Sequence, residues 1–139
     1  MKLDLREPLK FEKISFEENG SNLNITEHEE VLLCYELNSD QSRSIEPDCE
    51  NFLGSFLFSG RKIEGQITEQ VVSLPQGIYL FMQQRSAHAL NQAEWVDLAI
   101  EQQKDGLWER NKLENLLYIR FLHEDGAFVT QVFRSTETE

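Results

Sequence analysis

The sequence predicts an α+β fold, a single domain over residues 1–139 in which an antiparallel sheet carries two helices on one face. Runs of continuous or alternating apolar residues predict strands at 9–16, 31–37, 61–72, 77–84 and, as a hairpin, 116–134. Two amphipathic stripes predict helices at 45–58 and 90–104. The order strand, helix, paired strands occurs twice, which suggests a duplication of βαββ units.

The first elements are short strands. Leu9 to Phe16 alternates roughly between apolar and polar residues and leads into the turn signal Glu18-Asn19-Gly20-Ser21. Leu23 and Ile25 fit either a return strand or a cover for the core, so extra N-terminal strands are expected within 9–26. Val31 to Leu37 is a continuous apolar run of strand length, which predicts an interior strand.

Residues 45–58 fit a helix better than a strand. One stripe at helical spacing then holds Ile45, Cys49, Phe52, Leu53, Phe56 and Leu57. Ser44 can cap this helix, Pro47 suits its first turn, and Gly60 stands where it would stop. Gly54 is the residue that argues against it.

The second half of the chain gives clearer signals. Alternation over 61–72, the turn Leu74-Pro75-Gln76-Gly77 and the apolar run after it predict a hairpin-like pair of strands. A helix follows, with Asn91 and Glu94 as a variant capping box and Asp105-Gly106 as its end. Asp125-Gly126 predicts the tight turn of the last hairpin, and 135–139 is a polar tail.

Composition excludes several classes of protein. Thirteen Lys and Arg stand against 25 Asp and Glu, so the formal charge is -12, and nucleic acid would be repelled. No apolar run reaches the ~18 residues of a membrane span, and the N-terminal residues lack the apolar core of a secretory signal. Cys34 and Cys49 have no metal-like spacing and are both interpreted as core residues. We therefore expect a cytoplasmic protein with no nucleic-acid partner and no membrane segment.

Motifs for common chemistry are absent from the sequence. The three histidines, His28, His88 and His123, have no partner three or four residues away, so no metal site is expected. The chain has no phosphate-binding glycine loop and no nucleophile elbow, and no cofactor or catalytic residue is assigned.

Three carboxylates stand out because they lie in apolar strands or beside aromatic residues: Glu36, Glu69 and Glu114. A carboxylate at the mouth of an aromatic pocket attracts a lipophilic cation through Coulomb attraction and cation–π contact. The walls could come from Phe56, Phe58, Tyr79, Phe81, Trp95, Trp108 and Tyr118, although any of these can simply fill the core. Trp108 is of special interest because its neighbours Lys104, Asp105, Glu109 and Arg110 are charged.

The segment from Gly60 to Phe133 resembles the GyrI-like family of effector-binding domains, which are also found fused to bacterial transcription activators. The matching phrase runs from Val71 to Phe81 through Leu74-Pro75-Gln76-Gly77, and a helix with Trp95 and then Glu114 and Tyr118 follow. The sequence departs from the family at Gln83-Gln84-Arg85-Ser86 and in the last strand, Phe128 to Phe133, which lacks the usual Pro.

The resemblance implies a twice-repeated βαββ fold around a groove that binds a drug-like cation or regulates a protein partner. It places the acidic pocket residue at Glu114 and the walls at Tyr79, Trp95 and Tyr118. With Trp108 and Glu69 from the residue analysis, these are the candidate ligand-binding residues.

Three functions stay open, and binding is favoured over catalysis. The first is a stand-alone domain that binds a hydrophobic, cationic small molecule. The second is an acidic module or inhibitor that acts on a basic protein partner. The third is a small hydrolase with a Glu general base. The ligand, the partner and the oligomeric state are not specified by the sequence.

Overall fold

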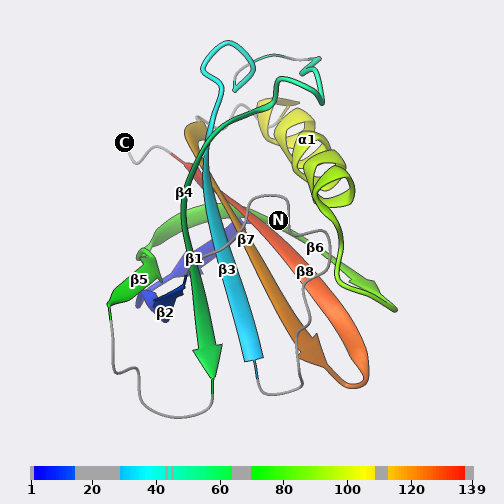
Figure 1. Ribbon diagram of the computed structural model, residues 1–139. Helices are drawn as coiled ribbons and strands as arrows, with labels where there is room; N and C mark the ends of the chain where they lie inside the picture. The colour runs from blue at the N-terminus through cyan, green and yellow to red at the C-terminus, as the bar shows by residue number, and fades with distance from the viewer. Residues whose placement is uncertain are drawn as a thin grey trace.

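The computed structural model describes residues 2–14, 29–42, 44, 46–63, 70–108 and 113–136. Within them, an eight-stranded antiparallel sheet curls into a half-barrel, and one helix packs against it (Figure 1). The order across the sheet is β1 (Lys2–Leu5), β6 (Gly77–Ser86), β8 (Ala127–Thr136), β7 (Leu113–Glu124), β3 (Glu29–Leu37), β4 (Leu53–Ile63), β2 (Leu9–Ile14) and β5 (Val71–Leu74).

This architecture corrects the predicted fold class. The described part of the chain contains a single helix, α1 (Gln92–Trp108), so the α+β fold with two helices on one face is wrong. The duplicated βαββ arrangement, which the family resemblance also implies, is wrong for the same reason. Apart from α1, the elements are strands of one sheet, and the fold is mostly β. No helix among these residues has the length and apolar character needed to cross a membrane.

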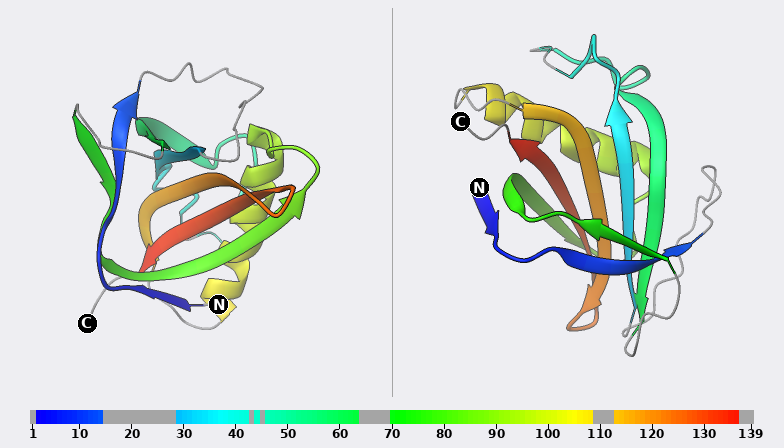
Figure 2. Two further views of the ribbon diagram at one scale, coloured as in Figure 1. Left: turned by 90° about the horizontal axis from the view of Figure 1, so that it is seen from below. Right: turned by 90° about the vertical axis from the view of Figure 1, so that its left-hand side faces the viewer.

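The two edges of the sheet are joined by strand pairing that involves β1, β2, β5 and β6. β1 pairs with β6 from Lys2↔Leu80 to Leu5↔Gly77, and β2 pairs with β5 from Leu9↔Leu74 to Glu12↔Val71. Both pairings involve the same two stretches of chain, residues 2–12 and 71–80. Each stretch bends once, at 6–8 and at 75–76. We call this bent pair of stretches, β1–β2 with β5–β6, the bent ribbon. Because it contains strands from both edges of the sheet, it brings the two edges together and the sheet wraps round (Figure 2).

Side chains pack on both faces of the sheet. The inner face of the curl is covered by residues from both ends of the sheet and from its central strands, including Phe11, Leu74, Tyr79, Tyr118 and Phe133. The outer face of the central strands β3, β7 and β8 packs against α1. β3 alternates between the two cores, which explains why its sequence is a continuous apolar run.

The predicted helix at 45–58 is wrong, because β4 begins at Leu53. β4 pairs with β3 through two bulges, which leave Gly54 and Leu57 without opposite partners. The second bulge changes the alternation, so Phe56 lies opposite Tyr35 in the helix-side core and Phe58 lies opposite Cys34 in the inner core. Apolar residues that point to both faces at irregular spacing resembled a helical stripe.

Gly54 and Gly60 stand where another part of the chain comes very close. A Cβ on Gly54 would lie 2.8 Å from the carbonyl oxygen of Glu36. A Cβ on Gly60 would lie 2.6 Å from both Phe11 Cβ and Val72 Cγ2. Gly60 is therefore the place where the bent ribbon crosses β4, not the end of a helix.

Helix α1 confirms the second predicted helix and its start. The backbone N–H of Glu94 donates to Asn91 Oδ1 (2.9 Å), and the backbone N–H of Asn91 donates to Glu94 Oε1 (3.1 Å). This is the predicted capping box. The predicted end is wrong, because the helix continues past Gly106 to Trp108. A Cβ on Gly106 would lie only 2.4 Å from Leu80 Cδ1, so this glycine allows the helix to approach the sheet.

The remaining elements are mostly as predicted. The strands at 9–16, 31–37 and 77–84 are confirmed as β2, β3 and β6, and the last hairpin as β7 and β8. Asp125 (φ 52°) and Gly126 (φ 78°) form its turn. Of the strand predicted at 61–72, only the ends are described, in β4 and β5, and β5 does not pair with β6 as a hairpin would. Leu23 and Ile25 lie outside the described residues, and β8 extends to Thr136.

Candidate functional site

Two of the predicted ligand-binding residues, Tyr79 and Tyr118, lie together on the inner face of the half-barrel. Their ring centroids are 6.0 Å apart and their planes are nearly perpendicular. Both side chains are almost completely buried, at 2% and 3% exposure. They therefore belong to a packed core, and an incoming ligand would have to displace side chains to stack on them.

An aromatic row crosses this inner face. Register places one residue from each of five neighbouring strands side by side: Phe81, Phe133, Tyr118, Cys34 and Phe58. The hydroxyl of Tyr79 donates to the carbonyl oxygen of Pro75 at 2.5 Å, at the bend of the ribbon. The row thus spans the inner face from β6 to β4, and the bond of Tyr79 ties its ring to the bend at Pro75.

Burial keeps the ionisable groups of this core protonated. Desolvation raises the pKa of Cys34 to about 12, although a hydrogen bond with Tyr118 works in the opposite direction. Desolvation also raises the pKa of Tyr79 to about 12, and it raises the pKa of Tyr118 further. A thiol and two phenols that remain neutral at physiological pH are suited to packing and hydrogen bonding, and not to nucleophilic chemistry.

Glu114 lies at the edge of the tyrosine pair. Its side chain is exposed at the start of β7, and its negative charge contributes to the raised pKa of both Tyr79 and Tyr118. Glu114 is thus close enough to the two rings to interact with them electrostatically. Three of the predicted residues therefore form one group, although the two rings are buried. Glu36, the other carboxylate noted on β3, is also exposed.

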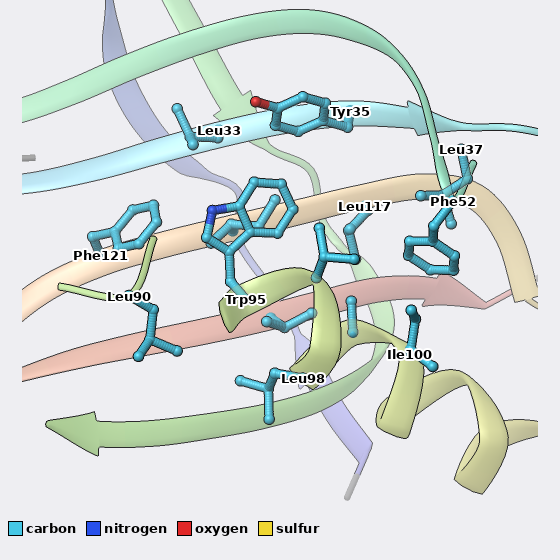
Figure 3. Close-up of a cluster of buried hydrophobic side chains, with 14 of the residues drawn as sticks. Leu33, Tyr35, Leu37, Phe52, Leu90, Trp95, Leu98, Ile100, Leu117 and Phe121 are labelled. Carbon is cyan, nitrogen blue, oxygen red and sulfur yellow. The ribbon is translucent and has the colours of Figure 1, made fainter. Parts of the chain in front are cut away.

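Trp95 lies on the opposite side of the sheet. It points from α1 into the helix-side core and lies against Tyr35 of β3, with ring centroids 5.2 Å apart (Figure 3). The sheet itself separates Trp95 from Tyr79 and Tyr118. The side chain of Trp108 and all of Glu69 lie outside the described residues. The structure therefore does not gather the six predicted residues around one cavity, and their role in binding stays a prediction.

A groove with a volume of about 460 Å³ lies elsewhere, between the start of β4 and the first turns of α1. One wall is formed by the turn before β4 and the first residues of that strand, and the other by the exposed side of α1. The lining residues are Cys49, Glu50, Leu53, Gly54, Gln92, Ala93, Val96 and Asp97. The groove falls in the usual size range of small-molecule sites, roughly 300–1,000 Å³.

The groove combines apolar walls with negative charge. Leu53, Ala93 and Val96 supply the apolar surface, and Glu50 and Asp97 supply a carboxylate from each wall. No positively charged side chain is among the residues that line it. This combination suits a ligand with an apolar body and a positive charge.

Cys49 is exposed in this groove, so its interpretation as a core residue is wrong. Its thiol donates a long hydrogen bond to Asp97 Oδ1 at 3.5 Å. Partial desolvation, followed by the hydrogen bond and charge of Asp97, raises the pKa of the thiol. Cys49 is therefore protonated at neutral pH and accessible to reagents, whereas Cys34 is a confirmed core residue at 1% exposure.

Sequence reasoning missed the groove because no local pattern encodes it. Its walls are residues 49–54 and 92–97, which tertiary packing brings together. The only available signal was the acidic character of Asp48, Glu50 and Asp97, which a solvated surface shows equally well. When compared with known proteins, the chain matches no family model, no curated protein and no solved structure.

Proposed function

We propose that this chain is a binding protein whose groove between α1 and β4 takes a small hydrophobic molecule with a positive charge. The observation that carries the proposal is the placement of Glu50 and Asp97 on opposite walls of one apolar groove. A cation between two carboxylates gains Coulomb energy, and the apolar walls bury the rest of the molecule. The ligand class is the one expected from the sequence, at a different place in the fold.

A thermal-shift screen identifies the ligand chemistry. Benzyltrimethylammonium and its uncharged tert-butyl analogue have the same shape, so their difference isolates the charge. A ligand at 100 times its dissociation constant stabilises the native state by about 2.7 kcal/mol. We expect a rise in melting temperature for the cation and a smaller rise for the neutral analogue. Equal shifts for the two probes would contradict a role for the carboxylates.

Asp97→Asn tests the location of the site. We expect the affinity for the cation, measured by calorimetry, to fall about three- to tenfold, which corresponds to about 0.7–1.4 kcal/mol for a partly exposed charge pair. Asp105→Asn is the matched control, because Asp105 is exposed on the same helix and does not line the groove. The proposal fails if the two variants bind equally, and a selective loss in Glu114→Gln would place the site at the tyrosine pair instead.

A basic protein partner is the second candidate. Asp97, Glu101 and Asp105 are exposed at spacings of four residues along α1, and Asp97 also belongs to the groove. Like charges four residues apart destabilise a helix, so this stripe is a cost that binding of a basic surface would offset. The affinity for a Lys- and Arg-rich peptide would then fall as much in Asp105→Asn as in Asp97→Asn. It would also fall for the wild-type protein in about 0.5 M salt, where charges on the surface are strongly screened.

A further inference from the structure

Three polar side chains from distant parts of the chain are buried together, further along α1 than the residues that line the groove. Ser42 follows β3, Gln103 belongs to α1 and Arg134 belongs to β8, and their exposures are 2%, 0% and 1%. Arg134 donates through Nη2 to the carbonyl oxygen of Ser42 (2.7 Å), through Nε to that of Glu114 (2.8 Å), and through Nη1 to Gln103 Oε1. A buried guanidinium is tolerated when its donors are satisfied in this way.

Gln103 connects this cluster to the loop that follows β3. Its amide nitrogen donates to the carbonyl oxygens of Gln41 (3.0 Å) and Ser44 (2.8 Å), while its amide oxygen accepts from Arg134. Together, Gln103 and Arg134 hold three carbonyl groups of this loop, at residues 41, 42 and 44. The bond from Arg134 is buried and the two bonds from Gln103 are partly buried, so competing water weakens them less than it would at the surface.

A second set of bonds extends from this loop to the groove. Gln41 Oε1 accepts from the backbone N–H of Asp48 at 2.6 Å. The carboxylate of Asp48 accepts from the backbone N–H of Glu50 (3.0 Å) and from Asn51 Nδ2 (2.7 Å). Cys49 and Glu50, which follow directly, form one wall of the groove.

We infer that Gln103 and Arg134 are positioning residues for the groove, which set the place of its Cys49–Glu50 wall without lining it. The hydrogen bonds run without a break from Arg134 through Gln103, Gln41 and Asp48 to the backbone of Glu50. The importance of this wall for a ligand rests on the proposed function, whereas its dependence on the buried pair does not.

The test uses the thiol of Cys49 as a reporter of the wall in the absence of any ligand. In Gln103→Glu, a carboxylate still accepts from Arg134 but cannot donate to Gln41 and Ser44, and it repels their carbonyl oxygens. We expect the loop to be released and the thiol to leave Asp97, whose charge disfavours the thiolate. The reaction of Cys49 with N-ethylmaleimide at neutral pH then becomes severalfold faster.

Gln102→Glu is the matched control. Gln102 is the adjacent buried glutamine, but its amide nitrogen donates to the carbonyl oxygens of Leu80 and Val132 in the sheet. The same chemical change therefore removes two buried hydrogen bonds without touching the loop. We expect the labelling rate of Cys49 to stay at the wild-type value in this control even where the melting temperature falls.

Mass spectrometry of the labelled protein keeps the result interpretable. One label per chain reports a folded protein, since Cys34 is buried, and two labels report unfolding. An unchanged rate in folded Gln103→Glu, or equal acceleration in Gln102→Glu, overturns the inference. If Gln103→Glu does not fold, Gln103→Met replaces it with Gln102→Met as its control, because it removes the donor to Gln41 and Ser44 without adding a charge, and the same two outcomes decide. The rates of Cys49 labelling are measured without a ligand, so failure to find a cationic ligand would not affect this test. That failure would count against the proposed function alone.

Discussion

Gly60 gives the sharpest test of how the sheet wraps on itself. It lies in β4, where the bent ribbon crosses this strand. A methyl group at this position would have no room beside Phe11 and Val72. Phe11 Cβ is fixed to its own strand, so it cannot withdraw without moving the backbone, whereas Val72 Cγ2 can withdraw only by a change of rotamer. Gly60→Ala forces that movement, and overpacking of this kind costs about 1–3 kcal/mol.

Gly77→Ala is the matched control for this substitution. Gly77 also lies in a strand, neither glycine has a positive φ, and the nearest atom to a Cβ on Gly77 is 3.9 Å away. Both substitutions restrict the unfolded chain equally, which alone stabilises by about 0.4–1 kcal/mol. Because this gain is common to both variants, the expected difference in free energy of unfolding between them is the overpacking cost alone, about 1–3 kcal/mol.

Urea denaturation with linear extrapolation measures this difference, and thermal unfolding gives a second reading. For a chain of this size the Gly60→Ala variant is expected to melt about 3–12 °C below Gly77→Ala. If the two variants are equally stable, the ribbon does not cross β4 as closely as described.

Two further predictions concern the two cores. Trp95→Ala removes the largest side chain between α1 and the sheet, and we expect urea denaturation to show that the free energy of unfolding falls by about 3–5 kcal/mol. Exposed Gln92→Ala is the control and should unfold like the wild type. A decrease below about 1 kcal/mol in Trp95→Ala would contradict the packing against Tyr35. The second is a pH dependence. Because the pKa values of Cys34 and Tyr79 rise from 9.0 and 10.0 to about 12 on folding, the native state holds these protons more tightly, so the free energy of unfolding is constant just below pH 9 and falls between pH 9 and 12. Urea titrations across this range check it, and a flat profile would show that these groups are hydrated in the native state.

The elements that could be predicted are those whose signals are local. The Asp125-Gly126 turn, the capping box of Asn91 and Glu94 and the apolar run of β3 each depend on residues a few positions apart. The fold class was wrong because β4 is irregular. Its bulge at Leu57 lets residues two positions apart, Phe56 and Phe58, face opposite cores, so neither strand nor helix periodicity describes the segment.

The turn at Pro75 shows a different limit. The sequence correctly indicates a bend there, but a bend does not specify whether the two flanking strands pair with each other or with a third segment. In the structure both pair with the N-terminal residues, from Lys2 to Glu12. That choice depends on contacts across about 70 residues of sequence and has no local signature. The groove was missed for the same reason, and the resemblance to the GyrI-like family stays a prediction.

The N-terminal ribbon also affects the order in which the protein can fold during synthesis. Residues 2–5 leave the ribosome long before 77–80, with which they pair, and β8, the other neighbour of 77–80, follows later still. β2 therefore remains unpaired until β4 is made and β1 until β6 is made, with Leu3, Leu5, Leu9 and Phe11 uncovered in the meantime. Such a topology, rich in contacts between distant residues, folds slowly, and the early segment is exposed to chaperones and to other chains in the meantime. The charges of Asp4, Lys10 and Glu12, which alternate with these apolar residues, help to keep that segment from aggregating before its partners arrive.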